Sequence, residues 1–165
     1  MTYFVLDRVC VGDAGASALA AALDRGALPR LKHLALSNAA IGYAGLVALA
    51  PALRRRPALE RLGLDRNPFG DEGLAALVAP PPADAPPPQA EALAQLKWLN
   101  LFATQITNAG CAHLASRLRS SALPALDTLY LDNSPVSPVS VSARTAVYEA
   151  RAGLNGYTVR HRVLN

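Results

Sequence analysis

Apolar residues recur with two different spacings in the segment that begins at Leu59. The spacing of Leu59, Leu62 and Leu64 indicates a short strand with one buried side. Leu74 and Leu77 follow at the three-residue spacing of a buried helix face. The pattern therefore predicts a strand, a turn and a helix in one short unit, which cannot bury its own apolar face without copies beside it.

Asn67 lies where the chain must turn out of this predicted strand. A side-chain amide has both a donor and an acceptor, so it can satisfy buried backbone groups that neither strand nor helix pairs. We therefore expect Asn67 to bind backbone groups of the turn.

The same unit recurs along the chain. Strand patterns begin at Met1, Leu31, Leu59, Leu96 and Leu126, and the second and third are 28 residues apart. Four of them continue into a turn that ends in glycine, over 11–15, 41–45, 69–73 and 106–110. A leucine pattern with a period in the twenties is typical of a leucine-rich repeat solenoid. The long period and the glycine turns resemble the ribonuclease-inhibitor class of these proteins.

This resemblance covers residues 1–136 and implies an α/β fold. It implies a right-handed strand–helix coil with a curved parallel sheet on the concave face and helices on the convex face. For function it is broad, since the class includes inhibitors, innate immune sensors, GTPase activators and actin-capping proteins.

The repeats suggest a division of the chain into two parts. Residues 1–136 are expected to hold about five repeats, with a proline-rich loop over 79–90 inserted between the third and fourth. Residues 137–165 depart from the template and are expected to form a degenerate C-terminal helix and a tail, a possible cap. Met1 falls on the opening position of a repeat without a polar cap, which suggests a fragment, an incomplete gene model, or pairing through this end.

Expected helices span roughly 13–24, 43–55, 71–79, 109–119 and 143–152. The first four open with Asp, Asn or Gly, which suit helix N-termini because an oxygen side chain can accept unpaired N–H groups there.

Composition and charge add little to this interpretation. Of the 165 residues 52% are hydrophobic but only 5% aromatic, so leucine and alanine must carry the packing. No stretch is long and apolar enough to span a membrane and no secretion signal is evident, which leaves the cytoplasm or nucleus as the expected location. The net charge of +4 comes from scattered arginines, and only Arg54–Arg56 cluster, at an expected helix end that we interpret as solvated. Cys111 takes a leucine or alanine position and is expected to be a small buried residue.

Candidate binding residues come from the outward positions of the strands. Leucines at positions 1, 4 and 6 of each repeat point inward, so positions 3, 5 and 7 form columns on the concave face. Exposed aromatic residues on such a rigid face are typical of protein-binding sites. The predicted partner-binding residues are Trp98, Phe102, Tyr130 and Asn100, with a charged rim of Arg61, Asp65, Arg66 and Asp132.

Catalysis has little support in the sequence. His33, Ser37 and Asp65 share the concave face, but solvated strands provide neither a pocket nor an oxyanion hole. We predict a non-enzymatic protein-interaction module with a protein partner, without cofactor, metal, membrane or small-molecule substrate. The alternatives are a regulator of a small GTPase and a sensor or scaffold fragment of a larger receptor. Nucleic-acid binding is disfavoured and would show strong salt dependence.

Overall fold

The computed structural model describes residues 2–80, 93–120, 122–131, 140–151 and 153–154. Short strands and helices alternate along this part of the chain. In order they are β1 (Tyr3–Val5), α1 (Gly12–Asp24), β2 (His33–Ala35), α2 (Tyr43–Arg54), β3 (Arg61–Gly63), α3 (Asp71–Leu77), β4 (Trp98–Asn100), α4 (Asn108–Arg119), β5 (Thr128–Tyr130) and α5 (Val141–Glu149). Most of the proline-rich segment and most of the predicted tail lie outside the described residues.

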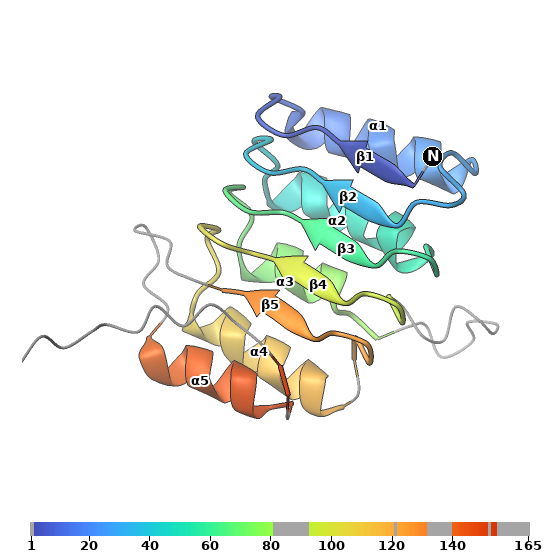
Figure 1. Cartoon of the computed structure of the whole chain (residues 1–165). Helices are drawn as coiled ribbons and strands as arrows, with labels where there is room; N and C mark the ends of the chain where they lie inside the picture. The colour runs from blue at the N-terminus through green and yellow to red at the C-terminus, as the bar shows by residue number, and fades with distance from the viewer. Residues whose placement is uncertain (1, 81–92, 121, 132–139, 152, 155–165) are drawn as a thin grey trace, which may run out of the picture.

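The five strands form one parallel sheet in sequence order, β1 to β5. Figure 1 shows the strands stacked as successive turns of one coil, with the helices on the opposite side of the sheet. Each helix therefore returns the chain to the start of the next parallel strand, as a parallel connection requires. The predicted strand–helix solenoid is confirmed.

The core lies between the sheet and the helices. The middle residues of β2 to β5 are leucines with at most 1% of their surface exposed: Leu34, Leu62, Leu99 and Leu129. The helices contribute leucines such as Leu49, Leu77 and Leu114, which are equally buried. In the first repeat, Phe4 and Leu19 hold the matching positions and are only partly buried. Cys111 is buried, as predicted from its position in the repeat.

Asn67 joins the second and third repeats through a buried set of hydrogen bonds. Its side chain is 1% exposed. Its Oδ1 accepts from the backbone N–H groups of Ala39 and Ile41, both at 3.0 Å. Its Nδ2 donates to the carbonyls of Leu36 at 2.7 Å and Leu64 at 2.9 Å. The role predicted for this amide is confirmed, and most of the bonds reach across to the neighbouring repeat.

Acidic and amide residues at the helix starts act differently from the prediction. They accept N–H groups from the following repeat, so each links two successive turns of the coil. The three contacts are Asp13 Oδ1 with Gly42 N at 2.7 Å, Asp71 Oδ1 with Thr107 N at 2.7 Å, and Asn108 Oδ1 with Ser140 N at 2.8 Å. Successive repeats lie close together at these contacts. A Cβ on Gly45 in α2, for example, would lie 2.9 Å from the Cα of Asp13 in α1.

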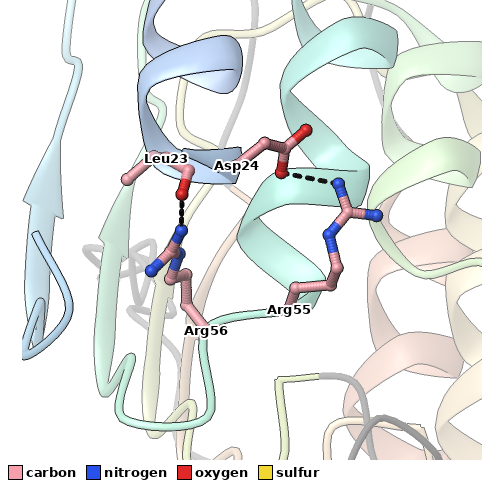
Figure 2. A network of polar contacts seen from close by, with 4 residues as sticks. All are labelled: Leu23, Asp24, Arg55 and Arg56. Carbon is pink, nitrogen blue, oxygen red and sulfur yellow. Dashed lines mark hydrogen bonds and ion pairs between the residues drawn. The ribbon is translucent and has the colours of Figure 1, made fainter. Parts of the chain in front are cut away.

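The cluster Arg54–Arg56 also differs from the solvated helix end expected of it. Arg56 donates to the carbonyl of Leu23 at the end of α1, and Arg55 pairs with Asp24 at 2.6 Å (Figure 2). Arg54 donates to the carbonyl of Ala79 at 3.2 Å and is half-buried, which lowers the pKa of its guanidinium, with the Arg55 charge adding to the effect. Arg54 and Arg56 thus bind carbonyl groups at the ends of neighbouring helices, where a cation is favourable.

The same use of arginine recurs further along the solenoid. Arg117 donates to the carbonyl of Val78 at 2.9 Å, and Arg151 donates to that of Ala122 at 2.6 Å. These arginines therefore serve the stacking of repeats. None of the helices in the described part of the chain has the length and apolar character needed to cross a bilayer.

Candidate binding face

Strand register places the outward side chains in two straight columns on the exposed side of the sheet, called here the sheet face. One column, at position 3 of the repeats, reads Tyr3, His33, Arg61, Trp98 and Thr128. The other, at position 5, reads Val5, Ala35, Gly63, Asn100 and Tyr130. Because the leucines between them point into the core, these side chains are the only ones that the strands offer to a partner. Both columns match the prediction.

Trp98 and Tyr130 form an aromatic pair in the C-terminal half of the sheet face. Their ring centroids are 5.7 Å apart, and the planes meet at 62° in an edge-to-face arrangement. The indole also extends over β3, where a Cβ on Gly63 would lie 3.7 Å from the Trp98 Cζ3 atom. The tryptophan therefore spans from β3 to β5 and is partly exposed on the sheet face.

Asp65 and Asn100 are brought together beside this pair. Asn100 Nδ2 donates to Asp65 Oδ1 at 3.0 Å, and the Ser37 hydroxyl donates to the same oxygen at 2.7 Å. Asn100 Oδ1 in turn accepts the backbone N–H of Phe102 at 3.0 Å. This chain of bonds crosses from β2 to β4 and holds the polar side chains at the strand ends in fixed positions.

The remaining predicted residues lie around this centre. Phe102 is half-buried just beyond the end of β4, and Arg61 is exposed at the start of β3. Arg66 is exposed at the turn after β3, where its backbone has a positive φ of 57°. Asp132 lies outside the described residues.

A second aromatic pair, Tyr3 and His33, occupies the N-terminal half of the sheet face. Their centroids are 4.3 Å apart in an edge-to-face arrangement. Burial, with a smaller effect from the Arg61 charge, lowers the pKa of His33, which favours the neutral imidazole. Both residues were placed in the position-3 column from the sequence but not assigned to the site. The signal was the column itself, since parallel in-register strands bring equivalent positions together.

A row of alternating charges borders the sheet face at position 2. Glu60 pairs with Lys32 at 2.9 Å and with Lys97 at 3.6 Å. The hydrogen bond from Lys32 lowers the pKa of Glu60, and the same bond raises the pKa of Lys32. All three side chains are at least partly exposed, so the row orients the surface more than it stabilises the fold.

The geometry shows how His33, Ser37 and Asp65 relate to one another. The Ser37 hydroxyl donates directly to Asp65, whereas a triad would place the histidine between them. Within the described residues, no three or more His, Cys, Asp or Glu side chains are grouped closely enough to hold a metal ion.

Comparison with known proteins agrees with this architecture. A leucine-rich repeat family model matches residues 28–50, which contain β2 and the first two turns of α2, and residues 57–78, which contain β3 and α3. The chain folds as a leucine-rich repeat solenoid. Among solved structures, "Leiomodin-1 Actin-Binding Site 2 (ABS2)" superposes with a TM-score of 0.68 over 91% of this chain and 78% of that one. At 17% identity this likeness concerns the fold. A search of curated proteins finds no match. The ribonuclease-inhibitor class stays a prediction.

Proposed function

We propose that this chain is a protein-interaction module whose sheet face binds a partner through Trp98, Phe102 and Tyr130. The observation that carries the proposal is the aromatic pair of Trp98 and Tyr130, in which the Trp98 indole lies over Gly63 and both rings remain partly exposed. Leucine-rich repeats are generally binding modules. The leiomodin-1 structure of the same fold bears a title that names an actin-binding site, which supports a protein as the class of partner.

A rigid aromatic pair gives favourable binding energetics. Tryptophan and tyrosine offer rigid, amphipathic contact surfaces and lose few rotatable bonds on binding. Here the edge-to-face contact already restrains both rings before a partner arrives, so less conformational entropy is lost in the complex. Truncation of a tryptophan at the centre of an interface typically costs about 2 kcal/mol or more.

The surrounding polar groups would fix the orientation of the partner. Asp65 and Asn100 are held by hydrogen bonds within the sheet face, and Arg61 and Arg66 are exposed beside them. Charged groups at the edge of an interface affect association rate and specificity more than affinity. Asp132 remains a proposed member of this rim on sequence grounds alone.

Affinity capture from a lysate of the source cells tests the proposal. The bait proteins are the wild type, a Trp98→Ala/Tyr130→Ala variant and a control Tyr43→Ala/Val47→Ala variant. Tyr43 and Val47 are 55% and 39% exposed on α2, so the control removes similar apolar surface from the helical side. Circular dichroism and urea unfolding establish that all three are folded.

We expect the wild type and the control to retain a common protein partner and the sheet-face variant to lose it. The identity of that partner separates the alternatives, since a small GTPase among the captured proteins would favour the regulator. If the sheet-face variant retains the partner and the α2 variant loses it, the helical side carries the function and the proposal is wrong.

A further inference from the structure

We propose that the partner segment bound on the sheet face is acidic, with carboxylates that pair with Arg8, Arg61 and Arg66 around an apolar residue that packs on Trp98. This inference rests on the proposed function, because it assumes that the sheet face is the binding surface. It follows from a difference between the carboxylates and the guanidinium groups at positions 2–8 of the repeats.

Every described carboxylate at these positions already accepts a bond from its own protein. Asp7 accepts the N–H of Ser37 at 3.0 Å, Glu60 pairs with Lys32 and Lys97, Asp65 accepts from Ser37 and Asn100, and Asp127 accepts the Thr128 hydroxyl at 2.8 Å. Each of these acids therefore uses part of its hydrogen-bonding capacity within the protein. Asp7, Glu60 and Asp65 use it to link neighbouring repeats.

The arginine side chains at the same positions, unlike these carboxylates, have no partner within the described residues. Lys32 and Lys97 are bound to Glu60, but the side chains of Arg8, Arg61 and Arg66 are exposed and form no hydrogen bond or ion pair with any other described residue. A guanidinium offers a fixed fork of N–H donors that matches a carboxylate, and pairing in that geometry is stronger than with a neutral acceptor. The charged side chains at these positions that have no partner in the described part of the chain are thus all arginines.

The three arginines are spaced for separate carboxylates. Arg61 opens β3 and Arg66 lies five residues further along, in the turn that follows the strand. Arg8 and Arg66 hold the same repeat position two strands apart, about 10 Å at the spacing between strands. Both have left-handed backbone, φ 59° and 57°, so their side chains leave the rim in the same way.

A protein segment suits this arrangement better than a nucleic acid. Asp65 lies between Arg61 and Arg66 along the chain, and Asp7 precedes Arg8, so a continuous phosphate backbone would meet these acids. A peptide can place single carboxylates at each arginine and an apolar side chain on the indole. Since Trp98 is the register neighbour of Arg61, the acid and the apolar residue would lie close together in the partner sequence.

Selection of short random peptides displayed on phage tests this inference. The immobilised proteins are the wild-type chain, an Arg8→Gln/Arg61→Gln/Arg66→Gln variant and a matched Arg25→Gln/Arg30→Gln/Arg119→Gln variant. The matched variant loses three positive charges, as the sheet-face variant does, but at exposed positions away from the sheet face. Selected peptides are then synthesised, and their affinities are measured by fluorescence anisotropy.

We expect the wild type to select peptides rich in Asp and Glu next to an apolar residue. The sheet-face arginine variant should bind them about tenfold more weakly or worse, and the matched variant should bind as the wild type does. A selection that yields no acidic peptides, or equal losses for the two variants, would overturn the inference. Arginine-dependent binding of a single-stranded RNA oligonucleotide in place of acidic peptides would overturn it in favour of nucleic acid.

The same peptides separate this inference from the proposed function. Peptides that lose affinity for the Trp98→Ala/Tyr130→Ala variant but are not acidic would leave the sheet face as the binding surface and remove only the acidic partner. Peptides that bind this variant as tightly as the wild type would overturn both.

Discussion

Replacement of Asn67 by alanine should lower the free energy of unfolding more than replacement of the polar residue at the equivalent position of any other repeat. The side chain is buried, and its Oδ1 is the acceptor for the N–H groups of Ala39 and Ile41, residues that are themselves 0% exposed. Alanine leaves both donors without a partner inside the second repeat. The carbonyl of Leu36 also loses its bond to Nδ2.

The magnitude follows from the number of buried groups left unpaired. A buried donor that loses its partner costs about 1–3 kcal/mol, so two such donors predict a loss of about 2–6 kcal/mol in the free energy of unfolding. Thr104 provides the matched control, since it holds the same position in the fourth repeat and is 3% exposed. Its hydroxyl donates a single bond, to the carbonyl of Leu101 at 2.9 Å, so Thr104→Ala should cost about 1 kcal/mol.

Urea unfolding followed by circular dichroism measures both variants against the wild type. Amide hydrogen exchange adds a local measurement, because the Ala39 and Ile41 amides should exchange faster in Asn67→Ala and unchanged in Thr104→Ala. If Asn67→Ala costs no more than Thr104→Ala, the link between the second and third repeats does not depend on this amide and the reasoning fails.

Two further predictions concern packing between repeats and thiol reactivity. Gly45→Ala should destabilise the chain by about 1–3 kcal/mol despite the better helix propensity of alanine, because the new Cβ would lie 2.9 Å from the Asp13 backbone. The control Gly70→Ala should cost under about 1 kcal/mol, because its Cβ would have its nearest neighbour at 3.6 Å. The urea midpoints of the two variants check this, and equal midpoints would contradict it. Burial, with a smaller contribution from the Asp71 charge, raises the pKa of Cys111 to about 11, so its thiol stays protonated at pH 8. Iodoacetamide should therefore label only Cys10 in the folded chain and both cysteines after unfolding. Mass spectrometry that finds Cys111 labelled in the native protein would refute the burial argument.

The leucine spacing was sufficient to predict the α/β solenoid for a physical reason. Leu59, Leu62 and Leu64 recur in register in the other repeats, and a unit that cannot bury its own apolar face must stack against its copies. The outward columns then follow from the alternation of side chains along a strand. The role of Asn67 was predictable too, because a single buried amide at a turn must bind backbone groups.

Contacts between repeats were harder to predict. Arg54 and Arg56 form a charge run at a helix end, a pattern usually typical of a solvated surface. Their carbonyl partners, Ala79 and Leu23, lie 25 and 33 residues away in sequence and are brought near only by the pitch of the coil. The pattern of residues within one repeat therefore does not reveal which carbonyl of a neighbouring repeat each arginine contacts.

The aromatic centre of the candidate site was predicted only in part. The sequence placed Trp98 and Tyr130 on one face, but their edge-to-face contact and the position of the indole over Gly63 depend on side-chain torsions and on the absence of a side chain on the next strand. Which residues bind a partner remains a proposal.

Trp98 also provides the most direct measurement of the central claim. It is the only tryptophan in the chain, so incorporation of 5-fluorotryptophan gives a protein with one ¹⁹F resonance, located on the sheet face. We expect that resonance to shift and to lose its sensitivity to dissolved paramagnetic probes when the captured partner is added, because the partner covers the indole. A complex that forms while the Trp98 resonance keeps its position and its accessibility would contradict binding on the sheet face.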